Sequence, residues 1–385
     1  MIQLKERLRQ LHRKLRWPQG AVDRFGPRAG SPAPSGEKPT RILLVNQDHD
    51  LAQTQFHAFK RFEARFAASG YAFASATYAA VAAGAAIPAA DAVFVQSGYE
   101  PPDGELEGVL SRIRRAGPAA AISYFDWFAP TDIRFAERVE PYVDHYVKKA
   151  LMRDRGWYLR PPTGHTNLSD HYALHHGADN PPATWSIPSA IVPRLMVGPS
   201  FSTGRALIHR FEQPTPTFEV DRPIDLHARI ATRGLPWYAG MREQAATAVE
   251  RLAGIETTSG MIAKELYMAE LGRSKICFSP FGYGEICWRD FEAIAMGAVL
   301  LKPAMDHIES DPDIYVADET YVPVRWDFAD LDTQVQALLA DPARRARLAA
   351  KAYTAVHAHL EQNYLESWLR RLLQRHDCRE TAIEV

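Results

Sequence analysis

The sequence predicts an α/β protein with two domains, and three observations lead to this prediction. The chain has 385 residues, two to three times the common size of one domain. Hydrophobic residues make up 46% of it and charged residues 24%, as in an ordinary globular protein with buried cores. Strand-like and helix-like segments alternate in two separate stretches, which is the pattern of Rossmann-like domains with parallel sheets.

The first stretch, residues 41–150, is expected to form an N-terminal Rossmann-like domain. It opens with the apolar run Arg41-Ile-Leu-Leu-Val45, which is typical of a strand covered on both faces. Phenylalanines then recur at three- and four-residue steps, so we expect a helix with an aromatic, core-facing stripe made of Phe56, Phe59, Phe62 and Phe66. Further strands are expected at 92–96, 119–125 and 142–147, with a helix at 106–115.

The second stretch, residues 221–345, is expected to form a C-terminal Rossmann-like domain. Its expected strands are 224–230, 274–279 and 298–302, and its expected helices include 241–253 and 288–296. Residues 151–220 are rich in proline and interrupt the alternation, so we interpret them as an inter-domain region or insertion. Residues 346–385 contain neither glycine nor proline and are expected to form C-terminal helices.

Two segments precede the first domain. Residues 1–16 alternate leucines with arginines and lysines and predict a basic amphipathic helix, while residues 17–40 are rich in Pro, Gly and Ser and predict a flexible linker. The helix lacks the continuous apolar run of a secretory signal, so we expect a cytoplasmic protein. The helix could lie peripherally on the inner face of an anionic membrane, or on an acidic face of the protein or a partner, and both interpretations stay open.

Charge and cysteine content exclude several classes of function. Forty-five basic and forty-six acidic residues leave a formal charge of -1, which gives no overall electrostatic basis for nucleic-acid binding. The three cysteines, Cys277, Cys287 and Cys378, form no CxxC pair, so neither a disulfide framework nor a structural zinc site is indicated. His171, His175 and His176 lie in the proline-rich region without a supporting carboxylate or cysteine, and we interpret them as solvated loop histidines.

The segment from Ser274 to Pro303 reads as strand, glycine loop, helix and strand. Gly282 and Gly284 permit a close backbone approach to a ligand, and a helix begins immediately afterwards. The free N–H groups and positive dipole at such a helix start favour phosphate. Arg289 and Glu292 share one helix face, so a guanidinium could meet phosphate while a carboxylate accepts two sugar hydroxyls. A surface ion pair between these two side chains is the alternative.

This segment resembles the donor-binding domain of GT-B glycosyltransferases of the exostosin-like and group 1 type, through Gly282-Tyr-Gly284, Arg289, Glu292-Ala-Ile-Ala295 and Gly297. The resemblance covers about the last third of the chain. It implies a GT-B-like fold of two domains facing a cleft, with Glu292 on the donor ribose and arginines on the diphosphate. The donor-binding residues that it implies are Arg233, Arg242, Lys275, Gly282, Tyr283, Gly284, Arg289 and Glu292. Group 1 enzymes separate two glutamates by seven residues, whereas Glu285 and Glu292 enclose six, so Glu285 receives no role.

The candidate catalytic residues follow strands of the first domain. Asp126 stands at the end of an apolar strand, where α/β sheets place ligand groups, and could act as a base with Trp127 stacked on a sugar. A turn or helix-capping aspartate is the alternative. Asp48 and His49 follow the first strand and could also contact the acceptor or act as base. Asp48-His-Asp50 has the form of a metal site of GT-A transferases, which is a less favoured alternative.

Together these features predict a glycosyltransferase of the hexosyl or a related class. The C-terminal domain is expected to bind a nucleotide-sugar donor and the N-terminal domain a glycan or lipid-linked acceptor, in surface polysaccharide synthesis. We expect no cofactor and no metal, because arginines and a helix start would neutralise the diphosphate. A sugar-nucleotide epimerase of GT-B shape and a non-catalytic two-lobed binding protein are the alternatives.

Overall fold

The computed structural model describes residues 38–160 and 164–383, so the predictions for residues 1–16 and for most of the linker lie outside the described residues. The first domain contains a six-stranded, wholly parallel sheet in the order β2-β1-β3-β4-β5-β7. Its strands are β1 (Thr40–Asn46), β2 (Tyr71–Thr77), β3 (Ala92–Val95), β4 (Ala121–Asp126), β5 (His145–Lys148) and β7 (Leu195–Val197). The expected α/β fold with a parallel sheet is confirmed.

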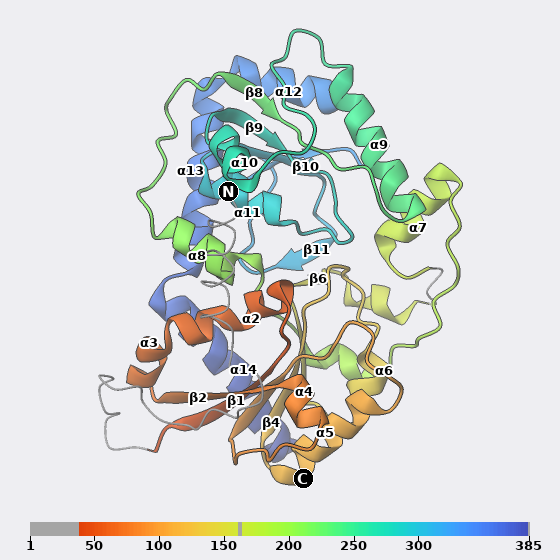
Figure 1. The fold of residues 1–385 in the computed structure, drawn as a ribbon, viewed down its shortest axis with the longest axis vertical. Helices are drawn as coiled ribbons and strands as arrows, with labels where there is room; N and C mark the ends of the chain where they lie inside the picture. Colours follow the sequence, from red (N-terminus) through yellow and green to blue (C-terminus); the bar gives the residue numbers. More distant parts are fainter. Residues whose placement is uncertain (1–37, 161–163, 384–385) are drawn as a thin grey trace, which may run out of the picture.

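The second domain contains a four-stranded parallel sheet in the order β12-β10-β9-β8. Its strands are β8 (Ile224–His227), β9 (Ser274–Phe278), β10 (Val299–Pro303) and β12 (Val322–Val324). The two sheets lie in separate lobes of the molecule, one above the other in Figure 1. The second α/β domain is therefore confirmed as well.

Helices cover the sheets of both domains. Those that precede the second domain are α2 (Asp50–Arg61), α3 (Glu63–Ala68), α4 (Tyr78–Ala82), α5 (Glu105–Ala116), α6 (Ala136–Val139), α7 (Asn167–His176) and α8 (Arg205–Phe211). The later ones are α9 (Pro236–Glu250), α10 (Lys264–Leu271), α11 (Trp288–Ala295), α12 (Leu331–Ala340), α13 (Pro342–His359) and α14 (Gln362–Ile383). Short 3-10 turns, η1 (Arg155–Leu159), η2 (Ser189–Arg194) and η3 (Phe201–Thr203), lie in the connecting region.

The phenylalanine stripe packs as expected, although the helix that carries it is interrupted. Phe56, Phe59 and Phe66 are buried in one cluster, while Phe62 separates α2 from α3 and is only partly buried. Trp368 of α14 joins the same cluster, with its ring centroid 6.2 Å from that of Phe59. The aromatic residues therefore form core, as their spacing predicts.

The C-terminal helices do not form a separate tail. Helix α13 contacts β10 and α11 of the second domain, whereas α14 returns to the first domain. There the indole nitrogen of Trp368 donates to the carbonyl oxygen of Val197 at 2.8 Å. Figure 1 shows α14 running from the upper lobe down along the first sheet. The expected helices after residue 346 are thus present, and the apolar face of α14 is buried on the first domain.

Residues 151–220 are not an insertion apart from the domains. They contribute β7, the edge strand of the first sheet, which pairs in parallel with β5. At their start β6 (Ala150–Met152) pairs antiparallel with β11 (Ile308–Ser310), which follows β10 of the second domain. This two-stranded sheet ties the domains together.

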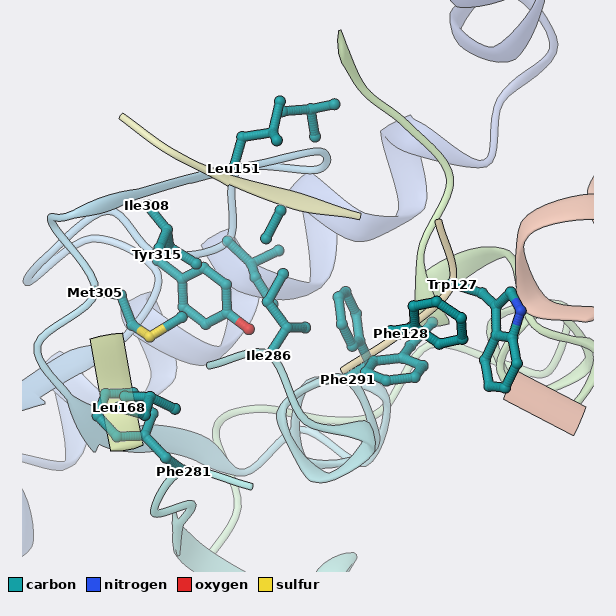
Figure 2. Close-up of a cluster of buried hydrophobic side chains, with 14 of the residues drawn as sticks. Trp127, Phe128, Leu151, Leu168, Phe281, Ile286, Phe291, Met305, Ile308 and Tyr315 are labelled. Atoms are coloured by element: carbon teal, nitrogen blue, oxygen red, sulfur yellow. The ribbon is translucent and has the colours of Figure 1, made fainter. Parts of the chain in front are cut away.

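A continuous apolar core joins the facing sides of the two domains. Figure 2 shows side chains of both domains gathered in one buried cluster, with Trp127, Phe128 and Leu151 from the first, Leu168 from the connecting region, and Phe281, Ile286, Phe291, Met305, Ile308 and Tyr315 from the second. Within the described parts of the chain, no helix is long and apolar enough to cross a bilayer.

Candidate functional site

The loops that follow β8 and β9 lie at the carboxyl edge of the second sheet and are held together by Arg242 of α9. Its Nε donates to the carbonyl oxygen of Ala231 at 2.9 Å, and its Nη1 donates to that of Phe281 at 3.0 Å. Burial, together with the charge of Arg289, lowers the pKa of Arg242. Arg242 is thus a buried residue that joins the two loops through their carbonyl oxygens. A direct contact of Arg242 with a diphosphate is not supported.

Arg289, the second residue of α11, spans the ends of the same strands. Its Nη1 donates to the carbonyl oxygen of Phe278 at 3.3 Å, and its Nη2 donates to the carbonyl oxygen of Arg229. Its Nε is buried and has no hydrogen-bond partner among residues 38–160 and 164–383. Tyr267 also lies beside the guanidinium, which is thus held at the helix start.

Glu292 lies one turn later on α11 and is almost buried. Its carboxylate pairs with Nζ of Lys264, the first residue of α10, whose side chain is 61% exposed. The alternative of a surface pair between Arg289 and Glu292 is therefore wrong, because Glu292 pairs with Lys264 and the guanidinium of Arg289 bonds backbone carbonyls. The arrangement keeps a carboxylate charge at the sheet edge.

A buried polar cluster that the sequence analysis missed fixes the start of α11. The carboxylate of Asp290 accepts hydrogen bonds from Ser279 Oγ at 2.5 Å, from the Cys287 backbone N–H at 2.9 Å and from the Tyr315 hydroxyl at 2.7 Å. Nζ of Lys302 on β10 lies 3.1 Å from it, and both charged side chains are fully buried. A lysine inside an apolar strand was the signal available in the sequence, because a buried ammonium needs a buried partner.

Aromatic rings cover one side of the loops. The ring of Tyr283 stacks on that of Tyr238, with centroids 4.4 Å apart and planes 11° apart, and Trp237 meets Tyr283 edge-on. The Tyr283 hydroxyl accepts the backbone N–H of Leu235 at 3.3 Å. Tyr283 is 40% exposed, so part of its ring can still contact a ligand. Arg233 is exposed in the loop after β8, where contact with a diphosphate stays a prediction.

The glycine loop contacts the other domain. A β-carbon added to Gly284 would lie 1.8 Å from the carbonyl oxygen of Ala129 in the first domain. At Gly282 the nearest atom to such a carbon would be Cys287 Sγ at 3.4 Å, an ordinary contact. A glycine at position 284 is therefore required for contact between the domains. The sequence pattern had instead suggested that this glycine allows a ligand to approach the backbone.

Glu285 also joins the domains. Its carboxylate accepts the hydroxyl of Thr131 from the first domain and lies 3.7 Å from His307 Nε2. Burial opposes its ionisation, but His307 and Thr131 outweigh burial and lower the pKa of Glu285. Sequence spacing left Glu285 without a role, and the structure places it at the domain interface.

Lys275 lies away from these loops. It is the second residue of β9 and therefore stands at the amino end of the strand, opposite the edge where the loops meet. Its Nζ pairs with Asp225 on the neighbouring strand at 2.8 Å. The prediction that Lys275 binds the donor is wrong, because parallel strands place this position at the far edge of the sheet.

In the first domain Asp126 is completely buried at the end of β4. Its carboxylate lies 2.7 Å from Lys148 Nζ, and it accepts the hydroxyl of Tyr146 at 2.5 Å and the backbone N–H of Phe128 at 2.9 Å. An aspartate with these partners and no solvent contact is a structural residue. The prediction that Asp126 is the catalytic base is therefore corrected in favour of the turn-capping alternative.

Asp48 and His49 are exposed at the carboxyl end of β1. The Nδ1 atom of His49 accepts the backbone N–H of Leu51 at 3.2 Å and so caps α2. Its ring stacks on Trp127 with centroids 4.6 Å apart. Trp127 is itself buried, with its indole donating to the carbonyl oxygen of Ser97, so it does not offer a free face to a sugar.

The metal-binding alternatives concern clusters of carboxylate, cysteine and histidine side chains. No group of three His, Cys, Asp or Glu side chains that could hold a metal ion occurs among the described residues. The sequence suggested that His171, His175 and His176 lie in a loop. The structure places them on helix α7 instead. His171 packs edge-on against Trp326 of the second domain, with centroids 4.8 Å apart.

Comparison with known proteins gives one family match, to residues 239–384, with the family described as glycosyl transferase-like. An α-glucosyltransferase in complex with UDP is 8% identical, over 87% of this chain and 99% of its own, with a TM-score of 0.49. A glycosyltransferase from Rickettsia africae is 9% identical, over 88% and 99%, with a TM-score of 0.47. The Anabaena protein HepE in complex with UDP is 9% identical, over 87% and 99%, with a TM-score of 0.44. No curated protein matches the sequence.

Proposed function

We propose that this chain, a GT-B fold whose residues 239–384 match the glycosyl transferase-like family, transfers a sugar from a nucleotide-sugar donor to an acceptor. The observation that supports this most is the start of α11, where Arg289 and the nearly buried Glu292 lie at the carboxyl edge of a parallel sheet within the matched segment. Parallel α/β sheets bind their ligands at this edge.

Each of these groups has a role in the proposed reaction. The carboxylate of Glu292, held by Lys264, accepts hydrogen bonds from ribose hydroxyls of the donor. The bond between the anomeric carbon and the diphosphate breaks, and negative charge grows on the leaving phosphate oxygen. The dipole of α11 and the guanidinium of Arg289 stabilise that charge, so these interactions strengthen in the transition state.

The acceptor is proposed to bind the first domain, with its hydroxyl near the carboxyl end of β1. Asp48 and His49 are exposed polar residues there that support this choice. Asp48 takes the acceptor proton, or His49 takes it at Nδ1 after releasing the N–H of Leu51. We propose a glycan or lipid-linked acceptor in surface polysaccharide synthesis. We also propose that the reaction needs no metal or cofactor.

The decisive experiment is transfer of labelled sugar from a panel of nucleotide sugars to glycan and lipid-linked acceptors, in excess EDTA. The wild-type chain is expected to form product, and E292Q is expected to lose most of it. E319Q is the matched control, because Glu319 is an exposed carboxylate paired with a lysine on the surface. Epimerisation of the donor alone, or binding without turnover, would reject the transferase. Loss in EDTA restored by Mn²⁺ would instead favour a metal site at Asp48 and Asp50.

Peripheral membrane contact through residues 1–16 is a separate proposal, based on their basic amphipathic sequence. Deletion of residues 1–16 should weaken sedimentation with anionic vesicles and leave a folded enzyme. Binding to vesicles that is unchanged by the deletion would reject this role.

A further inference from the structure

Lys149 stands where the chain passes from β5 of the first sheet to β6, the strand that pairs with the second domain. Its side chain is buried, and its Nζ lies 4.4 Å from the ring centroid of Phe201. Phe201 in turn stacks on Trp288, the first residue of α11, with centroids 4.6 Å apart. Lys149 therefore reaches from the first domain to the start of the helix where the donor diphosphate is proposed to bind.

The ammonium of Lys149 has no hydrogen-bond partner among the described residues. Titratable groups act on it from the neighbouring elements: Lys148 on β5, Asp126 on β4, and Glu285 and the Cys287 thiol in the loop before α11. Burial and then Lys148 lower the pKa of Lys149 to about 7, while Asp126, Cys287 and Glu285 oppose that shift. Burying an amine without a hydrogen-bond partner costs free energy. A ligand that supplies a negative charge would offset that cost, and this indicates a ligand for Lys149.

Two serine hydroxyl groups lie on either side of Phe201 in the chain. Ser200 and Ser202 flank Phe201 and are buried, and neither Oγ has a hydrogen-bond partner in the part of the chain that the structure describes. Buried polar atoms are normally paired. One amine next to the Phe201 ring and the hydroxyls of the two residues that flank Phe201 are therefore left without partners, and an anion could pair with all three.

We propose that Lys149, with Ser200 and Ser202, binds the diphosphate of the donor from the side of the first domain, opposite the start of α11. This inference rests on the proposed function and extends it, because the anion site is then shared by both domains. A nucleoside diphosphate fits these groups, since its oxygens can accept from the ammonium, the two hydroxyls and the helix N–H groups. Donor binding would then favour contact between the domains.

The test is calorimetry with uridine, guanosine, adenosine, cytidine and thymidine diphosphates and the matching nucleosides. Lys149→Met should weaken the best diphosphate by about 10-fold or more and leave its nucleoside unchanged. Lys351→Met is the control, because Lys351 is exposed on α13 and pairs with Glu319. Lys149→Met should also unfold at the same or a higher temperature than wild type, because it removes an unpaired buried amine.

A pH series separates binding from packing. Between pH 7 and 9 the diphosphate keeps its charge, whereas Lys149 of the empty protein loses its proton, so wild-type affinity should fall by up to about 10-fold per pH unit. Lys149→Arg, which stays charged, should show a weaker fall. Wild-type affinity and pH dependence in Lys149→Met would overturn the inference while Arg289→Ala still reports on the donor site. Failure of the wild-type chain to bind any diphosphate would reject the proposed function itself.

Discussion

Gly284 of the second domain lies so close to Ala129 of the first that a β-carbon on the glycine would be 1.8 Å from the Ala129 carbonyl oxygen. The glycine loop after β9 and the loop after β4 are therefore in backbone contact. The contact is next to the Thr131–Glu285 hydrogen bond and the β6–β11 pair, which also join the domains. These contacts, which lie near the proposed donor site, thus fix the position of the second domain relative to the first.

Gly284→Ala should force these two loops apart. The clash involves backbone on the other domain, so we expect a loss of about 1 to 3 kcal/mol in unfolding free energy, together with a larger radius of gyration. Urea unfolding and small-angle scattering measure the two effects. Gly108→Ala is the matched control, because Gly108 lies in helix α5 with no atom within 4 Å of the added carbon and should gain about 0.5 to 1 kcal/mol. A Gly284→Ala protein of wild-type stability and size would contradict the close contact.

Asp126→Asn should destabilise the first domain, because it leaves the buried ammonium of Lys148 without its counter-charge. We expect a cost of about 3 to 5 kcal/mol in urea unfolding. Asp126→Asn combined with Lys148→Met should recover much of the loss, since no lone charge remains. The amide oxygen can still accept the Phe128 N–H, and the amide nitrogen can donate to the Tyr146 hydroxyl. An Asp126→Asn protein with wild-type stability but no transfer activity would restore Asp126 as the base.

Glu292→Gln should retain the fold and weaken donor binding by about 1.5 to 3 kcal/mol, because the amide loses the charge that strengthens hydrogen bonds to hydroxyls. Arg289→Ala should weaken binding of the nucleoside diphosphate more than that of the nucleoside, whereas Glu292→Gln should affect both. Calorimetry with both ligands distinguishes a phosphate contact from a ribose contact. Wild-type affinities in both variants would remove the donor-site assignment.

His227 should make the protein less stable in mild acid. It is fully buried on β8, and burial, followed by the charge of Arg289, lowers its pKa to about 4. Between the unfolded pKa of about 6.5 and pH 4 the unfolded chain binds a proton that the folded chain does not, so stability falls as pH falls through this window. The loss attributable to His227 between pH 7 and pH 5 is about 2 kcal/mol.

Urea unfolding of His227→Phe at both pH values measures this contribution. The drop in unfolding free energy from pH 7 to pH 5 should be smaller than in wild type by about that amount. An identical drop in both proteins would show that His227 is not held in its neutral form. His57, whose pKa burial also lowers to about 4, provides a second site with the same sign.

Local patterns in the sequence were sufficient for much of the fold. The apolar runs that became β1, β4 and β9 and the helix starting at Trp288 were predicted within a few residues, because period and glycine position are local properties. Strand β2 (Tyr71–Thr77) was missed because it is rich in alanine, and its pairing with β1 is what stabilises it there. Strands β6 and β11 were missed because each is three residues long and pairs across the domains.

Local sequence patterns place chemistry-bearing residue types at strand ends and at the start of α11, whereas the packing of the folded chain sets which of them are paired. Asp126 lies in register with Lys148 on the next strand, which turned a candidate base into a buried ion pair. Gly284 meets Ala129, and Trp288 meets Phe201, only because the two domains pack against each other. A side chain's partner depends on strand order, register and domain contact, and these join residues that are distant in sequence, so no local pattern records them.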